Sequence, residues 1–125
     1  MNKLIENIGN HLDNVLKIDE CRYGQMPADI NNVVLLNFKS GVKPTYVFDR
    51  DNSLRRRPFL QVIVRNEDYF EGLKRVNDVF KELERLHGVH GILSITSTSD
   101  ILEYGRDSKN NYSFLTNFIL DVEEE

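Results

Sequence analysis

Three consecutive arginines, Arg55, Arg56 and Arg57, form the most concentrated group of charged side chains in the sequence. The polar residues around them add further basic side chains: Lys39, Lys43 and Arg50. Guanidinium groups bind phosphate and carboxylate groups through paired hydrogen bonds, so a local cluster of this kind can attract an anionic partner. Two interpretations stay open. One is a contact site for a DNA backbone or an acidic protein surface, and the other is a solvated loop whose charges block unwanted strand pairing.

Residues suited to metal binding are sparse. Asp49 and Asp51 have the D-x-D spacing of a metal-binding pair, but an aspartate-rich turn is the simpler interpretation. His87 and His90 have H-x-x-H spacing, but Gly88 lies between them and no acidic or cysteine ligand follows nearby. We therefore expect a histidine at a helix C-terminus, where a positive charge interacts favourably with the helix dipole.

The single cysteine, Cys21, is the one thiol nucleophile that the sequence offers. A pair with His11, His87 or His90 would have the chemistry of a cysteine hydrolase, but no glycine-rich oxyanion pattern accompanies it. We expect a half-buried structural cysteine in a reducing compartment. The sequence also lacks G-x-G-x-x-G, G-x-x-x-x-G-K and H-E-x-x-H, so the common nucleotide-binding and zinc-hydrolase classes are excluded.

Composition indicates one globular domain spanning residues 1–125. The chain has 125 residues, of which 40% are hydrophobic and 29% charged, a balance that supports one packed core. The formal net charge is −4, so any contact with DNA must be local. The N-terminal residues lack the apolar run of a signal peptide, and the longest unbroken apolar run is Val33 to Leu36. No membrane partner is expected.

Hydrophobic periodicity predicts two helices. The first runs to about Lys17, with an apolar stripe at three- and four-residue spacing. The second is longer, about 20 residues; it opens at Asp68, which with Glu71 has capping-box spacing, and ends at Gly88. Its predicted apolar face contains Tyr69, Phe70, Leu73, Val76, Val79, Phe80, Leu83 and Leu86. So wide an apolar face requires a sheet to cover it.

Alternating apolar and β-branched residues predict strands around these helices. The clearest strand is 58–65, with Leu60, Val62 and Val64 on the core face. The other expected strands are 22–26, 33–38, 45–48, 92–98, 101–105 and 112–122. Strands 33–38 and 45–48 are expected to form a hairpin around a loop at 39–44, and residues 49–57 a flexible exposed loop. The fold class is therefore α+β: a mostly antiparallel sheet with an N-terminal helix and one long central helix packed on one face.

The segment from Arg57 to Gly88, RPFLQVIVRNEDYFEGLKRVNDVFKELERLHG, has a distinctive pattern. A strand ends in Val-x-Val-Arg, a short polar turn leads to Asp-Tyr, and a long amphipathic helix closes on Leu-x-Gly. This pattern resembles the minor capsid or tail terminator (head–tail joining) proteins of long-tailed bacteriophages and prophages. The order of the expected elements resembles that family over most of the chain.

The resemblance implies a viral structural protein without catalytic residues or cofactors. Such proteins assemble as rings, usually hexameric, that cap the tail tube and meet the head connector or head-completion protein around a channel for DNA. The implied partners are therefore other copies of the chain, the tail tube protein, the head connector and, transiently, DNA. The implied location is the head–tail joint of the virion, after assembly in the bacterial host cytoplasm.

The family has no fixed arginine triplet, so charge and position alone suggest Arg50, Arg55, Arg56 and Arg57 as candidates for the DNA channel or a subunit interface. Three alternative functions stay open. One is another head-completion or connector protein. The second is a small metal-dependent hydrolase or nuclease that uses Asp49, Asp51 or Glu67. The third is a host-side adaptor module that binds a peptide on a sheet edge.

Overall fold

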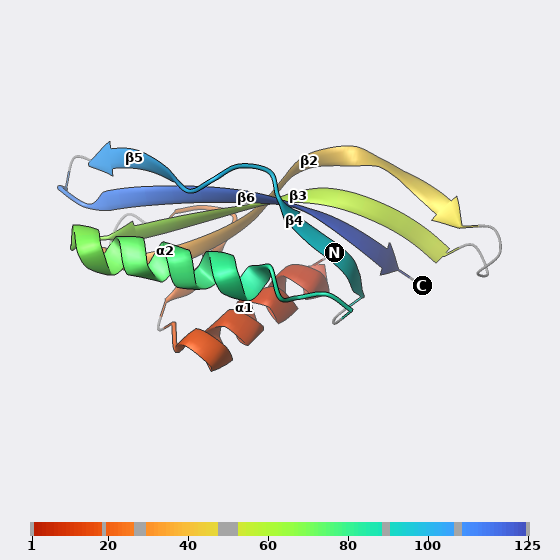
Figure 1. Cartoon of the computed structure of the whole chain (residues 1–125), viewed down its shortest axis with the longest axis horizontal. Helices are drawn as coiled ribbons and strands as arrows, with labels where there is room; N and C mark the ends of the chain where they lie inside the picture. The colour runs from red at the N-terminus through yellow and green to blue at the C-terminus, as the bar shows by residue number, and fades with distance from the viewer. Residues whose placement is uncertain are drawn as a thin grey trace.

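The computed structural model describes residues 2–18, 20–26, 30–47, 53–88, 91–106 and 109–124; at 2, 39–47, 53–55, 104 and 124 it describes the backbone only. Figure 1 shows the elements in chain order. Their bounds are α1 Asn2–Leu16, β1 Cys21–Tyr23, β2 Val33–Val47, β3 Ser53–Asn66, α2 Tyr69–Leu83, β4 Ile92–Ser97, β5 Leu102–Arg106 and β6 Tyr112–Glu124.

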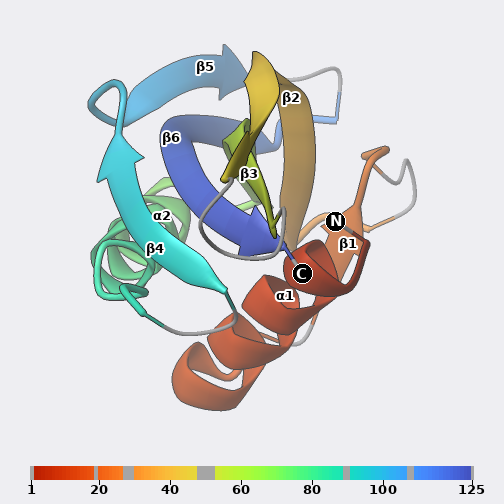
Figure 2. The same ribbon diagram turned by 90° about the vertical axis from the view of Figure 1, so that its right-hand side faces the viewer.

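The described strands form one six-stranded sheet in the order β1-β2-β3-β6-β4, with β5 also paired to β6. β1 runs parallel to β2, and the other pairs are antiparallel. β5 pairs with the first part of β6 and β4 with its last part, so the two short strands share one side of β6. Both helices lie on the same face of this curved sheet (Figures 1 and 2). The predicted α+β class is confirmed.

The core lies between the helices and the sheet, on the face that strand alternation predicts. Leu60, Val62 and Val64 of β3 are fully buried there. The other main contributors are Leu4, Ile8, Leu12, Val76, Val79, Leu83, Phe114, Phe118 and Leu120. Because a helix repeats every 3.6 residues and a strand every two, each element places its apolar set on one side, and these sides meet. Neither helix in the described residues has the length and hydrophobicity needed to cross a membrane.

The long helix α2 begins where the sequence predicts but ends earlier. The Asp68 carboxylate accepts a 3.0 Å hydrogen bond from the Phe70 N–H, which caps the first turn. The helix ends at Leu83, because the N–H groups of Arg85 and Leu86 donate to carbonyls three residues back and so tighten the last turn. Gly88 has a φ of +76°, and its N–H donates to the Ile92 carbonyl, so it shapes the connection to β4. Phe70 leaves the predicted apolar face and is 77% exposed.

The predicted hairpin between strands 33–38 and 45–48 is wrong, because both segments belong to the single strand β2, which forms a hairpin with β3 instead. Residues 39–44, predicted as a loop, continue β2, which runs from Val33 to Val47 and pairs with β3 from end to end apart from two irregularities. The pairing register shifts between Lys39 and Val42 and again between Val42 and Thr45. Gly41 and Pro44 therefore fall at β-bulges, which insert extra residues into a strand without ending it.

Candidate assembly surfaces

The arginine segment belongs to a strand and not to the predicted loop at 49–57. β3 begins at Ser53, so Arg55, Arg56 and Arg57 are strand residues, while Arg50 lies outside the described residues. Long-range pairing is the reason, because the part of β3 that contains the arginines pairs with β2 on one side and with β6 on the other. Arg56 is half-buried and Arg57 is exposed.

The strand register places acidic residues beside the arginines. Arg55 pairs at the Cα level with Glu123, and Leu54 with Glu124. Asp121 lies on the same end of β6. Opposite charges on neighbouring strands attract each other and reduce the net positive charge of the segment. The arginines and these acidic residues are at least 64 positions apart along the chain (121 − 57), so only the strand register brings them together.

The sheet has two open edges at the end where Arg55 to Arg57 lie. β1 pairs only with Val34 to Leu36 of β2, so within the described residues no strand covers the outer side of β2 from 37 to 47. At the opposite border, β4 pairs with β6 on one side and with no described strand on the other. Exposed edges carry backbone donors and acceptors that can pair with another chain.

The candidate catalytic residues do not form a site in the described part of the chain. Asp49, Asp51 and His90 lie outside the described residues. Glu67 is exposed at the turn before α2, and its backbone N–H donates to the Asn32 side chain. His87 is exposed after α2. No group of three histidine, cysteine or acidic residues with metal-binding geometry occurs among the residues that the structure describes.

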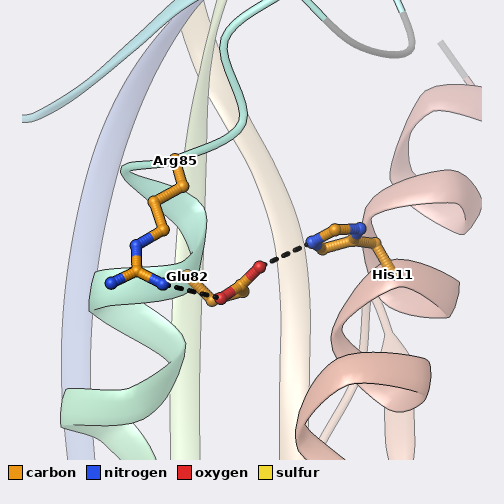
Figure 3. A network of polar contacts seen from close by, with 3 residues as sticks. All are labelled: His11, Glu82 and Arg85. Atoms are coloured by element: carbon orange, nitrogen blue, oxygen red, sulfur yellow. Dashed lines mark hydrogen bonds and ion pairs between the residues drawn. The ribbon is translucent and has the colours of Figure 1, made fainter.

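Cys21 has the environment of a structural thiol. Burial raises the pKa of the Cys21 thiol, and the charge of Asp13 raises it further, while a hydrogen bond with Tyr23 opposes this effect. A raised pKa reduces the thiolate that nucleophilic catalysis requires. His11 makes a different contact: its Nε2 lies 2.8 Å from Glu82 Oε1, and Arg85 lies 4.0 Å from the same carboxylate (Figure 3). This group joins α1 to α2.

A polar cleft of about 250 Å³ lies at the end of the sheet that carries β1. It is lined by Glu20, Asn66, Glu71 and Arg75, among others. Arg65 also lines the cleft; its side chain is buried, and its guanidinium donates to the Ile30 carbonyl. Alternation along β3 predicts that Arg65 lies on the face away from the core. The local pattern does not predict that the segment around Ile30, which precedes β2, covers the Arg65 side chain. The cleft mixes both charge signs, which favours a structural network over a site for one ligand.

The class of protein defined by the described residues is an α+β protein whose sheet has open edges and charged strand ends. The sequence pattern of the bacteriophage tail terminator protein family matches residues 4–124. This match spans nearly the whole chain, so the chain belongs to the bacteriophage tail terminator protein family. A comparison with curated proteins finds no match.

Family membership settles the general role. The chain is a structural, non-enzymatic component of the phage tail, as the resemblance of its central segment implies. The family also implies contact with the tail tube. The alternative of a metal-dependent hydrolase or nuclease is therefore not supported.

Proposed function

We propose that this chain stops tail growth by forming a ring, usually a hexamer in this family, on the end of the tail tube. One face of the ring contacts the last layer of tail tube protein, and the other offers the docking surface for the head connector or head-completion protein. The family match over residues 4–124 carries this proposal, and the open edges of the sheet support it. The mechanism is geometric, because a ring that covers the tube end leaves no surface for further tube subunits.

The β2–β3 hairpin and the end of β6 are the proposed contact region. Arg50, Arg55, Arg56 and Arg57 belong to this region, either at the subunit interface or beside the DNA channel. The acidic end of β6 pairs with Arg55 and Leu54, so we favour the subunit interface as their main role. A strongly basic DNA channel would require more unbalanced positive charge than this strand end carries. Contact with DNA is then transient and electrostatic.

The proposal is tested with purified protein and purified tail tube protein. Light scattering and negative-stain electron microscopy should show a ring, either with the chain alone or on the ends of tubes. Tubes assembled with excess chain should stay shorter than tubes assembled without it. A chain that remains monomeric in both conditions and leaves tube length unchanged would contradict the proposed function.

A further inference from the structure

We propose that the open edge of β2 binds β4 of a second copy of the chain, so that neighbouring subunits share one continuous antiparallel sheet. This inference rests on the proposed ring and specifies its subunit interface. It assigns an occupant to each open edge: the outer side of β2 from 37 to 47 in one copy receives the outer side of β4 in the next. An interface between two different edges is head-to-tail, which is the type that closes rings.

The two edges lie at the same level of the sheet. One row of paired residues runs from Lys39 through Phe59 and Ile119 to Thr96. A second row runs from Thr45 through Arg55 to Glu123, whose N–H donates to the Gly91 carbonyl. The open part of β2 and the whole of β4 therefore span the same height. Neighbouring copies can therefore join edge to edge without being displaced along the strand direction. A displacement of this kind at every junction would give a helical filament, and its absence favours a closed ring.

The strand directions also match. β2, β3, β6 and β4 alternate in direction across the sheet, so β4 runs opposite to β2. A rotation about an axis roughly along the strands preserves these directions from copy to copy. The junction between β2 and β4 is then antiparallel, like the pairs within each subunit.

The backbone donors and acceptors face the junction in a compatible register. The Val34 N–H donates to the Glu20 carbonyl and the Leu36 carbonyl accepts from the Gly24 N–H, on the side of β2 where β1 lies. Alternation along the strand therefore turns the polar groups of Phe38 to the same outer side. On β4, the Thr98 N–H donates to the Asn117 carbonyl of β6, so the polar groups of Ser97 face away from β6. Phe38 and Ser97 can thus form a hydrogen-bonded pair across the junction.

Lys39 and Thr96 would then form the adjacent pair without backbone hydrogen bonds. In such antiparallel pairs the Cα atoms are about 4.5 Å apart, within the range that a disulfide spans. Charge does not oppose the junction. Residues 37–47 include Lys39 and Lys43 and no acid, while β4 is uncharged and borders the acidic end of β6.

Disulfide trapping tests the interface directly. In a Cys21→Ala background, Lys39→Cys combined with Thr96→Cys should give a ladder of cross-linked species on oxidation, up to the ring size. The control combines Thr96→Cys with Arg22→Cys. Arg22 lies on β1 beside Leu35, outside the open part of β2, so this pair should give no ladder. A wild-type ring with no ladder from the first pair would overturn the shared-sheet proposal. Cross-linking of Lys39→Cys to tail tube protein instead would also overturn it.

A backbone variant provides an independent test. Ser97→Pro removes an N–H that faces the junction, whereas Ser97→Ala keeps it. We expect Ser97→Pro to lose ring formation while its melting temperature and monomer mass stay close to those of Ser97→Ala. A ring of normal mass in a folded Ser97→Pro variant would overturn the proposed edge pairing. Failure of the proposed function is a different result, because the wild-type chain would then form no ring at all.

Discussion

The ring of Tyr23 fills the space beside Gly9 where a side chain would otherwise lie. A Cβ placed on Gly9 would come within 2.9 Å of Tyr23 Cζ, closer than carbon atoms normally approach. Gly9 lies in the middle of α1, where glycine weakens a helix by about 1 kcal/mol relative to alanine. Helix propensity alone would therefore disfavour glycine at this position. The structure shows why the residue is there: it lets β1 pack against α1.

Gly9→Ala should therefore destabilise the protein, in spite of the better helix propensity of alanine. We expect a loss of about 1–3 kcal/mol in the free energy of unfolding, because Tyr23 must move to relieve the overlap. Urea denaturation measures this. In a Tyr23→Ala background the same substitution should become stabilising by about 0.5–1 kcal/mol, since propensity then acts alone. The same sign in both backgrounds would contradict the steric explanation.

The contact between His11 and Glu82 should couple α1 to α2. Both side chains are partly buried, and removing one polar partner at such a site costs about 1 kcal/mol. A double-mutant cycle with His11→Ala and Glu82→Gln should give a coupling free energy of about 0.5–1 kcal/mol. Glu84→Gln, at an exposed position two residues further on, is the control and should show no coupling to His11→Ala. Additive effects of His11→Ala and Glu82→Gln would mean that the bond contributes nothing.

Thr116 should tolerate an apolar replacement. Its side chain is fully buried in the core, and its Oγ1 has no hydrogen-bond partner within the described residues. Thr116→Val keeps the shape and removes the cost of burying a hydroxyl, so we expect a gain of about 0.5–1 kcal/mol in thermal or urea unfolding. The matched change Thr98→Val, at an exposed position, should be near neutral. A loss of stability in Thr116→Val would show that the hydroxyl has a partner, such as a buried water.

The thiol of Cys21 should react slowly in the folded protein. Its pKa is raised above the ordinary value of 9.0, mainly by burial, so less thiolate is present at pH 8 than for an exposed cysteine. Alkylation with iodoacetamide should be slower for the native chain than for a Cys21→Ala, Glu84→Cys variant, and the difference should vanish in denaturant. Equal native rates would contradict the assignment of a buried, protonated thiol.

The raised pKa of the Cys21 thiol also makes the stability of the protein depend on pH in the alkaline range. A group whose pKa is higher in the folded state stabilises the fold while it is protonated in both states. The Cys21 contribution to the free energy of unfolding is therefore fully present below pH 9.0 and is lost as pH rises through the folded pKa. Cys21→Ala should show a shallower decline of stability over this range than wild type.

Removing the three arginines should affect assembly more than folding. We expect Arg55→Ala, Arg56→Ala and Arg57→Ala together to lower the free energy of unfolding by less than about 1 kcal/mol, because strand-end charges contribute little each. Ring formation and phage infectivity should fall. The control removes three exposed helix lysines, Lys3, Lys74 and Lys81, and so changes net charge equally. Normal assembly and infectivity in the arginine variant would exclude a role for the segment.

Much of the fold follows from local pattern. The start of α2 at Asp68 and the core face of Leu60, Val62 and Val64 are set by capping and alternation, which act over a few residues. The same kind of reasoning wrongly divided β2 into two strands joined by a loop at 39–44. Gly41 and Pro44 are typical turn residues, and only the pairing partner reveals that they lie at bulges.

The sequence by itself determined two amphipathic helices, an antiparallel sheet and membership of the tail terminator family, because periodicity and family pattern are properties of the residues in order. Only the tertiary structure decided that Arg55 lies beside Glu123, that Tyr23 occupies the space at Gly9, and that the open edges of β2 and β4 share one level. These relationships depend on strand register between distant segments. A register shift of one residue would reverse the face of every side chain in a strand, and no local rule selects it.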